Sequence, residues 1–160
     1  MLVHGDFFQI GVVVHDIDEG MARYRALMGV GPFWRLDTDY QGRYRDWTGR
    51  FANRNAFARW GNVYLEMVEP VVGEGNAKEW LHMRGEGIFH LGYAVDDMAQ
   101  RPGGAECVFE SFGATLPDGG AAVIHLDTVA PLGYYLEITH RPMAEAINAR
   151  IDEELARLQP

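Results

Sequence analysis

The sequence predicts an α+β fold in which two β-α-β-β-β modules form one curled, cup-shaped mixed sheet, and an internal repeat is the main reason. Two pairs of segments align without a gap: 9–17 with 90–98, and 63–67 with 134–138. Gln9 and His90 open the first pair. Glu66 and Glu137 lie in the second pair, 57 and 47 residues further on. The 160 residues therefore read as one domain made of two related halves.

The first module, at about 7–70, begins with an apolar strand at 8–14 that leads into an amphipathic helix. Asp16 or Asp18 is the predicted N-cap, and the glycines and proline of 29–32 end the helix. The apolar face of this helix consists of Ile17, Met21, Tyr24 and Leu27 or Met28. Three strands are predicted to follow, at 33–37, 54–60 and 63–68, with a hairpin turn at Gly61-Asn62.

The second module, at about 87–140, follows a connecting helix predicted at about 76–83. Its predicted elements are a strand at 89–95, a helix at 106–112, and strands at 121–127 and 134–138. A last amphipathic helix at 143–158 carries apolar residues at Ile147, Ile151, Leu155 and Leu158. This helix is expected to pack on a sheet or on a partner.

Composition excludes several functions. With 14 Lys+Arg against 23 Asp+Glu the net charge is −9, and no basic cluster favours a nucleic-acid partner. The longest apolar run near the start, 10–14, is too short for a membrane span or a secretory leader, so a cytoplasmic protein without membrane contact is expected. The chain has one cysteine, one serine and one lysine, namely Cys107, Ser111 and Lys78. These numbers disfavour disulfides, acyl transfer through serine and Schiff-base chemistry, respectively. The glycine-rich motifs that bind phosphate groups are absent.

Strand alternation predicts that the repeated polar residues share one cavity. Side chains two apart in a strand lie on the same face, so Gln9 and Gly11 lie on the face opposite to that of Ile10, Val12 and Val14. His90 and Gly92 repeat this arrangement in the second half. In each later strand, the glutamate side chain lies on the face opposite to that of its apolar neighbours. A glycine two positions after each polar residue leaves room for a ligand.

Two carboxylates brought together inside a sheet repel each other and lose hydration unless a cation or a shared proton compensates. One divalent metal ion would compensate for both the repulsion and the lost hydration. The predicted metal ligands are Gln9, Glu66, His90 and Glu137. This donor set suits Zn²⁺, Ni²⁺, Co²⁺, Mn²⁺ or Fe²⁺ with open positions for water and a small-molecule substrate.

The duplicated module with these four residues resembles the vicinal oxygen chelate superfamily, which includes glyoxalases, bleomycin-resistance proteins and dioxygenases. The resemblance covers roughly 7–140 and implies a glyoxalase-like fold. The segments at 29–33, 65–70 and 85–92 look like the branch that contains methylmalonyl-CoA epimerase and glyoxalase-like proteins. Carried over by position, the four metal ligands of the family fall on the same four residues.

The resemblance implies a metal-dependent lyase, isomerase or epimerase that transfers a proton next to a carbonyl through an enediolate or enolate. It implies Glu137 as the catalytic base and Glu66 as the other proton carrier. Epimerases of this branch usually have histidine where Gln9 stands, whereas a Gln, Glu, His, Glu set is similar to that of zinc-type glyoxalase I. The further glutamate that epimerases carry in their first half is not found between Glu19 and Glu66.

Two other functions stay open. One is a non-catalytic small-molecule binding protein of the bleomycin-resistance type. The other is an extradiol dioxygenase, which needs Fe²⁺ held by two histidines and one carboxylate, and Gln9 in the place of the first histidine disfavours it. The exposed edges of an open four-stranded module also predict a homodimer.

The other residues capable of chemistry are given structural roles. Histidines without a matching partner in the repeat are expected at the surface or in loops: His4, His15, His82, His125 and His140. Six arginines fall between 35 and 59, namely Arg35, Arg43, Arg45, Arg50, Arg54 and Arg59. A solvated strand face is favoured for them over binding of a substrate anion. Aromatic residues of the same stretch could wall a pocket or fill the core: Tyr40, Tyr44, Trp47, Phe51, Phe57 and Trp60.

Overall fold

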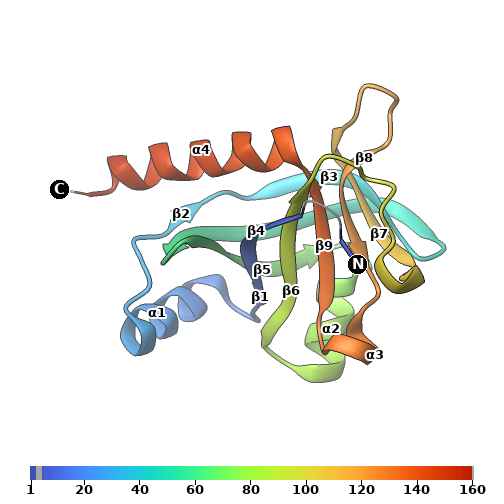
Figure 1. The fold of residues 1–160 in the computed structure, drawn as a ribbon. Helices are drawn as coiled ribbons and strands as arrows, with labels where there is room; N and C mark the ends of the chain where they lie inside the picture. Colours follow the sequence, from blue (N-terminus) through green and yellow to red (C-terminus); the bar gives the residue numbers. More distant parts are fainter. Residues whose placement is uncertain (3–4, 160) are drawn as a thin grey trace.

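In the computed structural model, which describes residues 1, 2 and 5–159, most of the chain forms one strongly curved mixed sheet flanked by helices (Figure 1). The strands are β1 (Asp6–Val13), β2 (Trp34–Arg35), β3 (Thr38–Tyr44), β4 (Trp47–Trp60), β5 (Val63–Val72), β6 (Gly87–Val95), β7 (Cys107–Thr115), β8 (Ala121–Leu126) and β9 (Tyr135–His140). The helices are α1 (Ile17–Met28), α2 (Asn76–Arg84), α3 (Val129–Leu132) and α4 (Arg141–Arg157), with a 3-10 turn η1 (Pro102–Gly104). The predicted α+β class is confirmed.

The sheet closes on itself. Its strand order is β2-β4-β3-β7-β8-β9-β6-β1-β5, and β4 also pairs with β5. The two modules meet twice, through the antiparallel pair β1–β6 and through the antiparallel pair β3–β7. All strands except the short β2 therefore form a closed ring, and the edges that the sequence analysis expected to be exposed are paired within one chain.

The first module follows the predicted pattern at its start. The side chain of Asp16 accepts hydrogen bonds from the backbone N–H groups of Asp18 and Glu19, both at 2.9 Å, and so caps α1. Gly29 ends the helix in the left-handed conformation. Val12, Val14 and Ile17 pack with strands β4 and β5 in a core beneath α1. Leu27 and Met28 are exposed, at 80% and 56%, so the predicted apolar face of this helix ends at Tyr24.

The later strands of this module differ in extent from the prediction. The strand expected at 33–37 is the two-residue β2, and a separate strand β3 follows it. The strand expected at 54–60 is the second half of β4, which is 14 residues long and pairs with β3 through its first half and with β5 through its second. The predicted turn at Gly61-Asn62 joins β4 to β5.

The second module contains no helix where one was predicted. The segment expected to be helical at 106–112 lies in strand β7, so that prediction is wrong. Val108 and Phe109 are buried in the core enclosed by the ring, and β7 pairs with β3 on one side and β8 on the other. Met98 and Ala105 pack on the outer face of this half instead. Pairing with β3, which is distant in sequence, and with the neighbouring strand β8 therefore overrides the local helical pattern.

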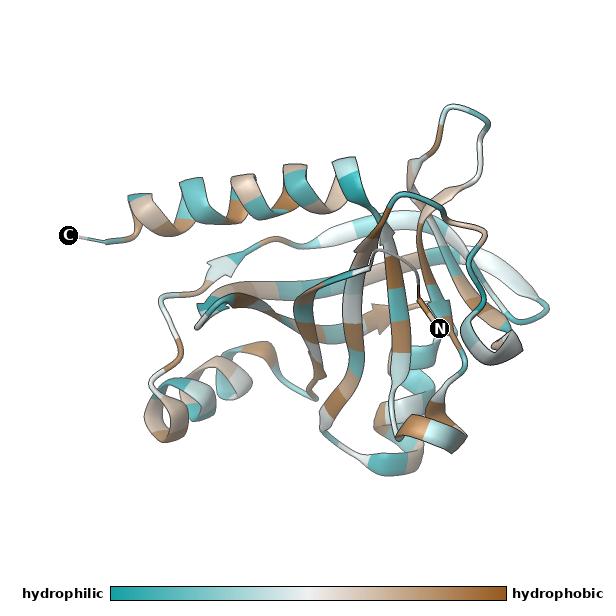
Figure 2. Cartoon of the chain, in the orientation of Figure 1, coloured by the Kyte–Doolittle hydropathy of each residue, from teal (hydrophilic) through white to brown (hydrophobic). Residues whose placement is uncertain are grey.

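Helices α2 and α4 lie toward opposite ends of the closed sheet (Figure 1). Helix α2, which covers the segment predicted at 76–83, contributes Trp80 to the enclosed core. Helix α4 buries Ile151 and Leu155 against Phe57 and Tyr64, and its hydrophobic side faces the strands (Figure 2). Leu158 is 52% exposed, contrary to the prediction. Within the described residues, no helix has the length and apolar character needed to cross a membrane.

Candidate metal centre

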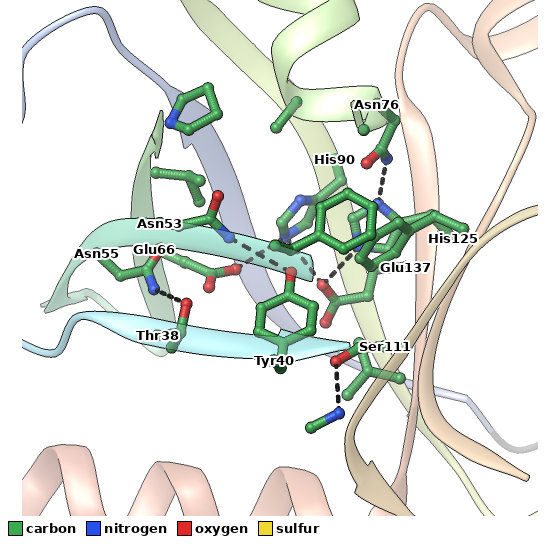
Figure 3. A pocket seen from close by; sticks show the side chains of 18 of the residues that line it. Thr38, Tyr40, Asn53, Asn55, Glu66, Asn76, His90, Ser111, His125 and Glu137 are labelled. Carbon is green, nitrogen blue, oxygen red and sulfur yellow. Dashed lines mark hydrogen bonds and ion pairs between the residues drawn. The ribbon is translucent and has the colours of Figure 1, made fainter. Parts of the chain in front are cut away.

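The four predicted ligands come from four consecutive strands of the ring, in the order β9-β6-β1-β5. Gln9 lies on β1, Glu66 on β5, His90 on β6 and Glu137 on β9. Parallel pairing places Gly11 beside Glu66 in one half, and the repeat places Gly92 beside Glu137 in the other. Because cross-strand partners share a face, all four side chains enter the interior of the ring, where they line one cavity. Figure 3 shows Glu66, His90 and Glu137 close together in this cavity.

Three oxygen atoms surround one nitrogen of His90. The Nε2 atom lies 3.2 Å from Gln9 Oε1, 3.4 Å from Glu66 Oε2 and 3.3 Å from Glu137 Oε2. His90 is 1% exposed, and its Nδ1 has no hydrogen-bonding partner among the described residues. Every described polar contact of this ring is therefore made by Nε2.

Two glycines create the space for this convergence. A Cβ at Gly11 would lie 2.1 Å from Cε1 of His90 and 2.3 Å from its Nε2, so the imidazole occupies the volume that a side chain would fill. A Cβ at Gly92 would lie 3.0 Å from Gln9 Cβ and 3.3 Å from Glu137 Oε1. In the pairing of β1 with β6, Gly11 lies opposite His90 and Gly92 lies opposite Gln9. The glycine of each half therefore makes room for the polar side chain of the other half.

Burial shifts the pKa of each titratable group in this cluster. Desolvation lowers the pKa of His90 to about 4 despite the opposing charge of Glu137, so its imidazole is neutral at pH 7. Desolvation, followed by the negative charge of Glu137, raises the pKa of Glu66 to about 8. Burial also acts to raise the pKa of Glu137, but the imidazoles of His90 and His125 and a hydrogen bond from Thr139 outweigh it, and the pKa lies below its usual value.

This donor set fits a divalent cation. A neutral imidazole nitrogen carries at most one proton, so Nε2 of His90 can donate to only one of the three oxygens around it. The other two oxygens receive no proton from this ring, and the carboxyl groups of Glu66 and Glu137 share the same buried space. A metal ion bound between the four atoms would convert these repulsive contacts into coordination bonds.

His125 is the residue that the sequence analysis placed wrongly. It is 5% exposed and lies on β8 opposite Glu137, not at the surface or in a loop. Its Nε2 lies 3.0 Å from Glu137 Oε2, and Asn76 Nδ2 lies 2.5 Å from its Nδ1. The side chains of His90, His125 and Glu137 form a buried group that could hold a metal ion, with donor atoms within 4.8 Å of one another.

One sequence signal could have found His125. The residues of 121–126 other than His125 are all apolar, on both alternating faces. This pattern is typical of a strand buried on both sides, which leaves the histidine no solvent-facing side. Of the other histidines, His15 and His82 are exposed and His140 is half-buried, while His4 lies outside the described residues.

The cavity around the cluster has a volume of about 430 Å³ and extends from α2 to α4. Of the aromatic residues considered from sequence, Tyr40, Phe51 and Phe57 line it. Tyr44 belongs to the enclosed core and Trp60 packs near α1, so the stretch serves both the pocket and the core. Trp47 is 37% exposed.

The arginines between 35 and 59 all form ion pairs with acidic side chains, and one of these acidic partners, Asp39, lines the cavity. The pairs are Arg35–Asp18 at 2.7 Å, Arg43–Glu110 at 2.6 Å, Arg45–Asp127 at 3.6 Å, Arg50–Asp39 at 2.6 Å, Arg54–Glu69 at 2.8 Å and Arg59–Asp152 at 3.1 Å. None of the six lines the cavity within the described part of the chain.

Comparison with protein families identifies the group to which this architecture belongs. Residues 8–103 match the model of the Glyoxalase/Bleomycin resistance protein/Dioxygenase superfamily. The chain belongs to this superfamily. The resemblance inferred from the repeat is confirmed at this level. A comparison with curated proteins finds no match.

Several solved structures have a similar fold. A methylmalonyl-CoA epimerase variant from Streptomyces coelicolor, in complex with 2-nitronate-propionyl-CoA, is 21% identical over 84% of this chain and 95% of its own, with a TM-score of 0.57. The methylmalonyl-CoA epimerase from Mycobacterium tuberculosis is 18% identical over 88% of this chain and 92% of its own, with a TM-score of 0.58. A hypothetical protein from Bacillus halodurans is similar at 21% identity, 86% and 95% coverage and a TM-score of 0.57. These likenesses concern the fold.

Proposed function

We propose that the protein is a metal-dependent lyase, isomerase or epimerase that transfers a proton at the carbon next to a carbonyl group. The observation that carries this proposal is the convergence of Gln9, Glu66 and Glu137 oxygens on Nε2 of His90 inside the cavity of the ring. Membership of the superfamily and the epimerase-like fold support it.

Gln9, Glu66, His90 and Glu137 would hold the metal ion, whose identity stays open. When bound, the ion supplies positive charge that stabilises the oxyanion formed as the proton leaves the neighbouring carbon. His90 enters as a neutral ligand through Nε2, because burial keeps its pKa near 4. The two carboxylates balance the charge of a divalent ion.

Glu66 is better placed than Glu137 to move the proton. Glu137 is held by Thr139, whose hydroxyl donates to Oε1 at 2.8 Å, and by His125 at Oε2. The only ion pair described for Glu66 is to His90, and its side chain is 19% exposed against 7% for Glu137. Glu66 can therefore rotate toward a substrate at little cost, whereas Glu137 would have to break two hydrogen bonds.

The test is exchange of the substrate α-hydrogen with D₂O, measured by NMR on metal-reconstituted protein with hemithioacetals and acyl-CoA thioesters. We expect exchange in the wild type and a loss of at least about 100-fold in Glu66→Gln. Glu74→Gln is the matched control, because Glu74 is exposed and pairs with Lys78 outside the cluster. A wild type that binds no metal and exchanges no hydrogen would favour a non-catalytic binding protein.

A second candidate function is extradiol ring cleavage, which one observation favours. His90, His125 and Glu137 provide the two imidazoles and one carboxylate typical of Fe²⁺ oxygenases. Against it, Nε2 of His125 already contacts Glu137 and Nδ1 contacts Asn76, so both ring nitrogens of His125 are engaged. Oxygen consumption by the Fe²⁺-loaded protein with catechols would favour this function over proton transfer.

A further inference from the structure

The proposed metal ligands occupy one half of the ring, and strand β3 lies across from them. Three of the described strands separate β3 from β6 in either direction around the ring, so β3 faces the strand that carries His90. In a ring of about eight strands, the interior is just wide enough for side chains to fill it. Tyr40 of β3 lines the cavity. Its side chain therefore approaches the cluster from the opposite wall.

The ring of Tyr40 is held by residues on both neighbouring strands. It stacks on Phe51 of β4, with ring centroids 5.7 Å apart and an angle of 15° between the planes. A Cβ at Gly113 of β7 would lie 3.1 Å from Tyr40 Cβ and 3.4 Å from its Cγ. Phe51 is fixed in turn, because a Cβ at Gly42 or Gly73 would lie within 2.9 Å of its ring. The position of the Tyr40 hydroxyl is therefore set before a ligand binds.

The hydroxyl of Tyr40 lies near both carboxylates of the cluster. Figure 3 shows it pointing toward Glu66 and Glu137. Burial is the main cause that raises the pKa of Tyr40, and the negative charges of the two glutamates add to it, while a hydrogen bond from Asn53 acts in the opposite direction. The phenol is therefore protonated at neutral pH.

The hydrogen of this hydroxyl is available to a ligand. Asn53 Nδ2 donates to the Tyr40 oxygen at 3.3 Å, and among the described residues this is the only hydrogen bond that the hydroxyl makes. A tyrosine hydroxyl can accept and donate at the same time. Because Asn53 occupies an acceptor position, the hydrogen is left to point elsewhere in the cavity.

A hydrogen-bond donor at this place suits an oxygen that gains negative charge. In the proposed reaction Glu66 takes the proton from the substrate carbon, and the electron pair of the C–H bond moves to the neighbouring carbonyl oxygen. A donor that is positioned in advance stabilises the charged oxygen more than the neutral carbonyl, so it lowers the barrier.

We propose that Tyr40 is a catalytic residue whose hydroxyl donates a hydrogen bond to the substrate oxygen on which negative charge develops, and that Asn53 directs this hydrogen. The proposal rests on the function proposed above. It assigns a role to the wall opposite the metal ligands, and Tyr40 has no part in holding the metal.

The test is Tyr40→Phe, which removes the hydroxyl and keeps the ring that stacks on Phe51. Acetohydroxamate is a chelator whose negatively charged oxygen resembles that of the reaction. By calorimetry it should bind to the Co²⁺-loaded variant at least about tenfold more weakly than to the wild type. With the substrate that the wild type exchanges, the α-hydrogen exchange rate at saturation should fall about 100-fold. Co²⁺ affinity and the Co²⁺ absorption spectrum should stay unchanged.

Tyr24→Phe is the matched control. Tyr24 is also half-buried and packs against an aromatic ring, that of Trp60 at 6.1 Å, but it lies on α1 and does not line the cavity. This variant should change neither the affinity for acetohydroxamate nor the exchange rate. If Tyr40→Phe does not fold, Asn53→Ala tests the same hydroxyl and should weaken acetohydroxamate binding by about threefold to tenfold.

Two results would overturn the role of Tyr40 alone. One is a Tyr40→Phe variant that binds acetohydroxamate and exchanges hydrogen as the wild type does. The other is a loss of Co²⁺ affinity as large as the loss of acetohydroxamate affinity, which would mean that Tyr40 only supports the structure of the site. A wild type that binds no Co²⁺ or exchanges no hydrogen overturns the proposed function, and the role of Tyr40 with it.

Discussion

His90 lies at the centre of the unfavourable contacts in the metal-free protein. Its neutral ring faces three oxygens, two of them from carboxylates that share a buried space. The cost falls most heavily on Glu66, whose pKa rises from 4.5 to about 8. The folded protein therefore binds a proton at Glu66 in a pH range where the unfolded chain has lost it.

This difference predicts how the stability of the metal-free protein depends on pH. Between pH 6.5 and 8 the folded state holds more protons than the unfolded state, so the free energy of unfolding should fall by about 1–2 kcal/mol as the pH rises through this range. Below pH 6.5 the lowered pKa of His90 acts in the opposite direction, so the comparison belongs above that value. Urea denaturation in the presence of a chelator measures the change.

Glu66→Gln should remove that pH dependence and leave the metal-free protein more stable than the wild type at pH 8. Adding the metal should reverse the order, because the wild type gains stability by binding the ion while the variant gains less. A wild-type stability that stays constant or increases from pH 6.5 to 8 is incompatible with a crowded, partly protonated Glu66.

Gly11 makes the strongest steric prediction. In Gly11→Ala the new methyl group would overlap the His90 ring, so the ring must move and the metal affinity should fall at least tenfold, with a loss of about 1–3 kcal/mol in stability. Gly92→Ala is the control, because the nearest atom to its new Cβ would be 3.0 Å away rather than 2.1 Å. It should lower both the metal affinity and the stability by less than Gly11→Ala does. Equal effects of the two substitutions on metal affinity would mean that His90 is not the residue displaced.

The sequence alone could indicate which residues repeat but not what lies next to them. Duplication singled out Gln9, Glu66, His90 and Glu137 because two short matching segments recur in the same order in each half of the chain. His125 has no counterpart in the first half, and its contact with Glu137 depends on the register of β8 against β9.

Strand β7 shows why one element could not be predicted. A local pattern in 106–112 suggested a helix, but Arg43 and Tyr44 of β3 pair with this segment from a distant part of the sequence. Ile124 of the following strand β8 pairs with its other edge. Pairing on both edges and burial of Phe109 outweigh a helical preference of a few tenths of a kcal/mol per residue. The elements predicted correctly, such as α1 and the turn at Gly61-Asn62, have their signals within a few residues.

Helix α4 is predicted to stabilise the fold without forming the metal site. Its Ile151 is completely buried against the sheet, so Ile151→Ala should lower the free energy of unfolding by about 2–4 kcal/mol. The number of metal ions bound per folded chain should not change. Leu158→Ala, at a position that is 52% exposed, is the control and should cost less than about 0.5 kcal/mol. Chemical denaturation and metal analysis of both variants test this division of roles.

Closure of the ring places both halves of the site in a single chain. The β1–β6 and β3–β7 pairings remove the exposed edges from which a homodimer was expected, and the dimer itself stays a prediction. We expect one metal ion per chain at every protein concentration, whatever the oligomeric state. Light scattering combined with elemental analysis across a dilution series measures both quantities, and one ion per two chains would mean that the site is shared between protomers.

The most direct measurement is anomalous X-ray diffraction from crystals of the Co²⁺-loaded protein. The account predicts a single strong anomalous peak inside the ring, within coordination distance of the side chains of Gln9, Glu66, His90 and Glu137. A peak coordinated by His125 in place of Gln9 and Glu66 would contradict the assigned ligand set. No peak in the cavity, or one only at an exposed histidine such as His15, would contradict the central claim that these residues converge in order to bind a metal.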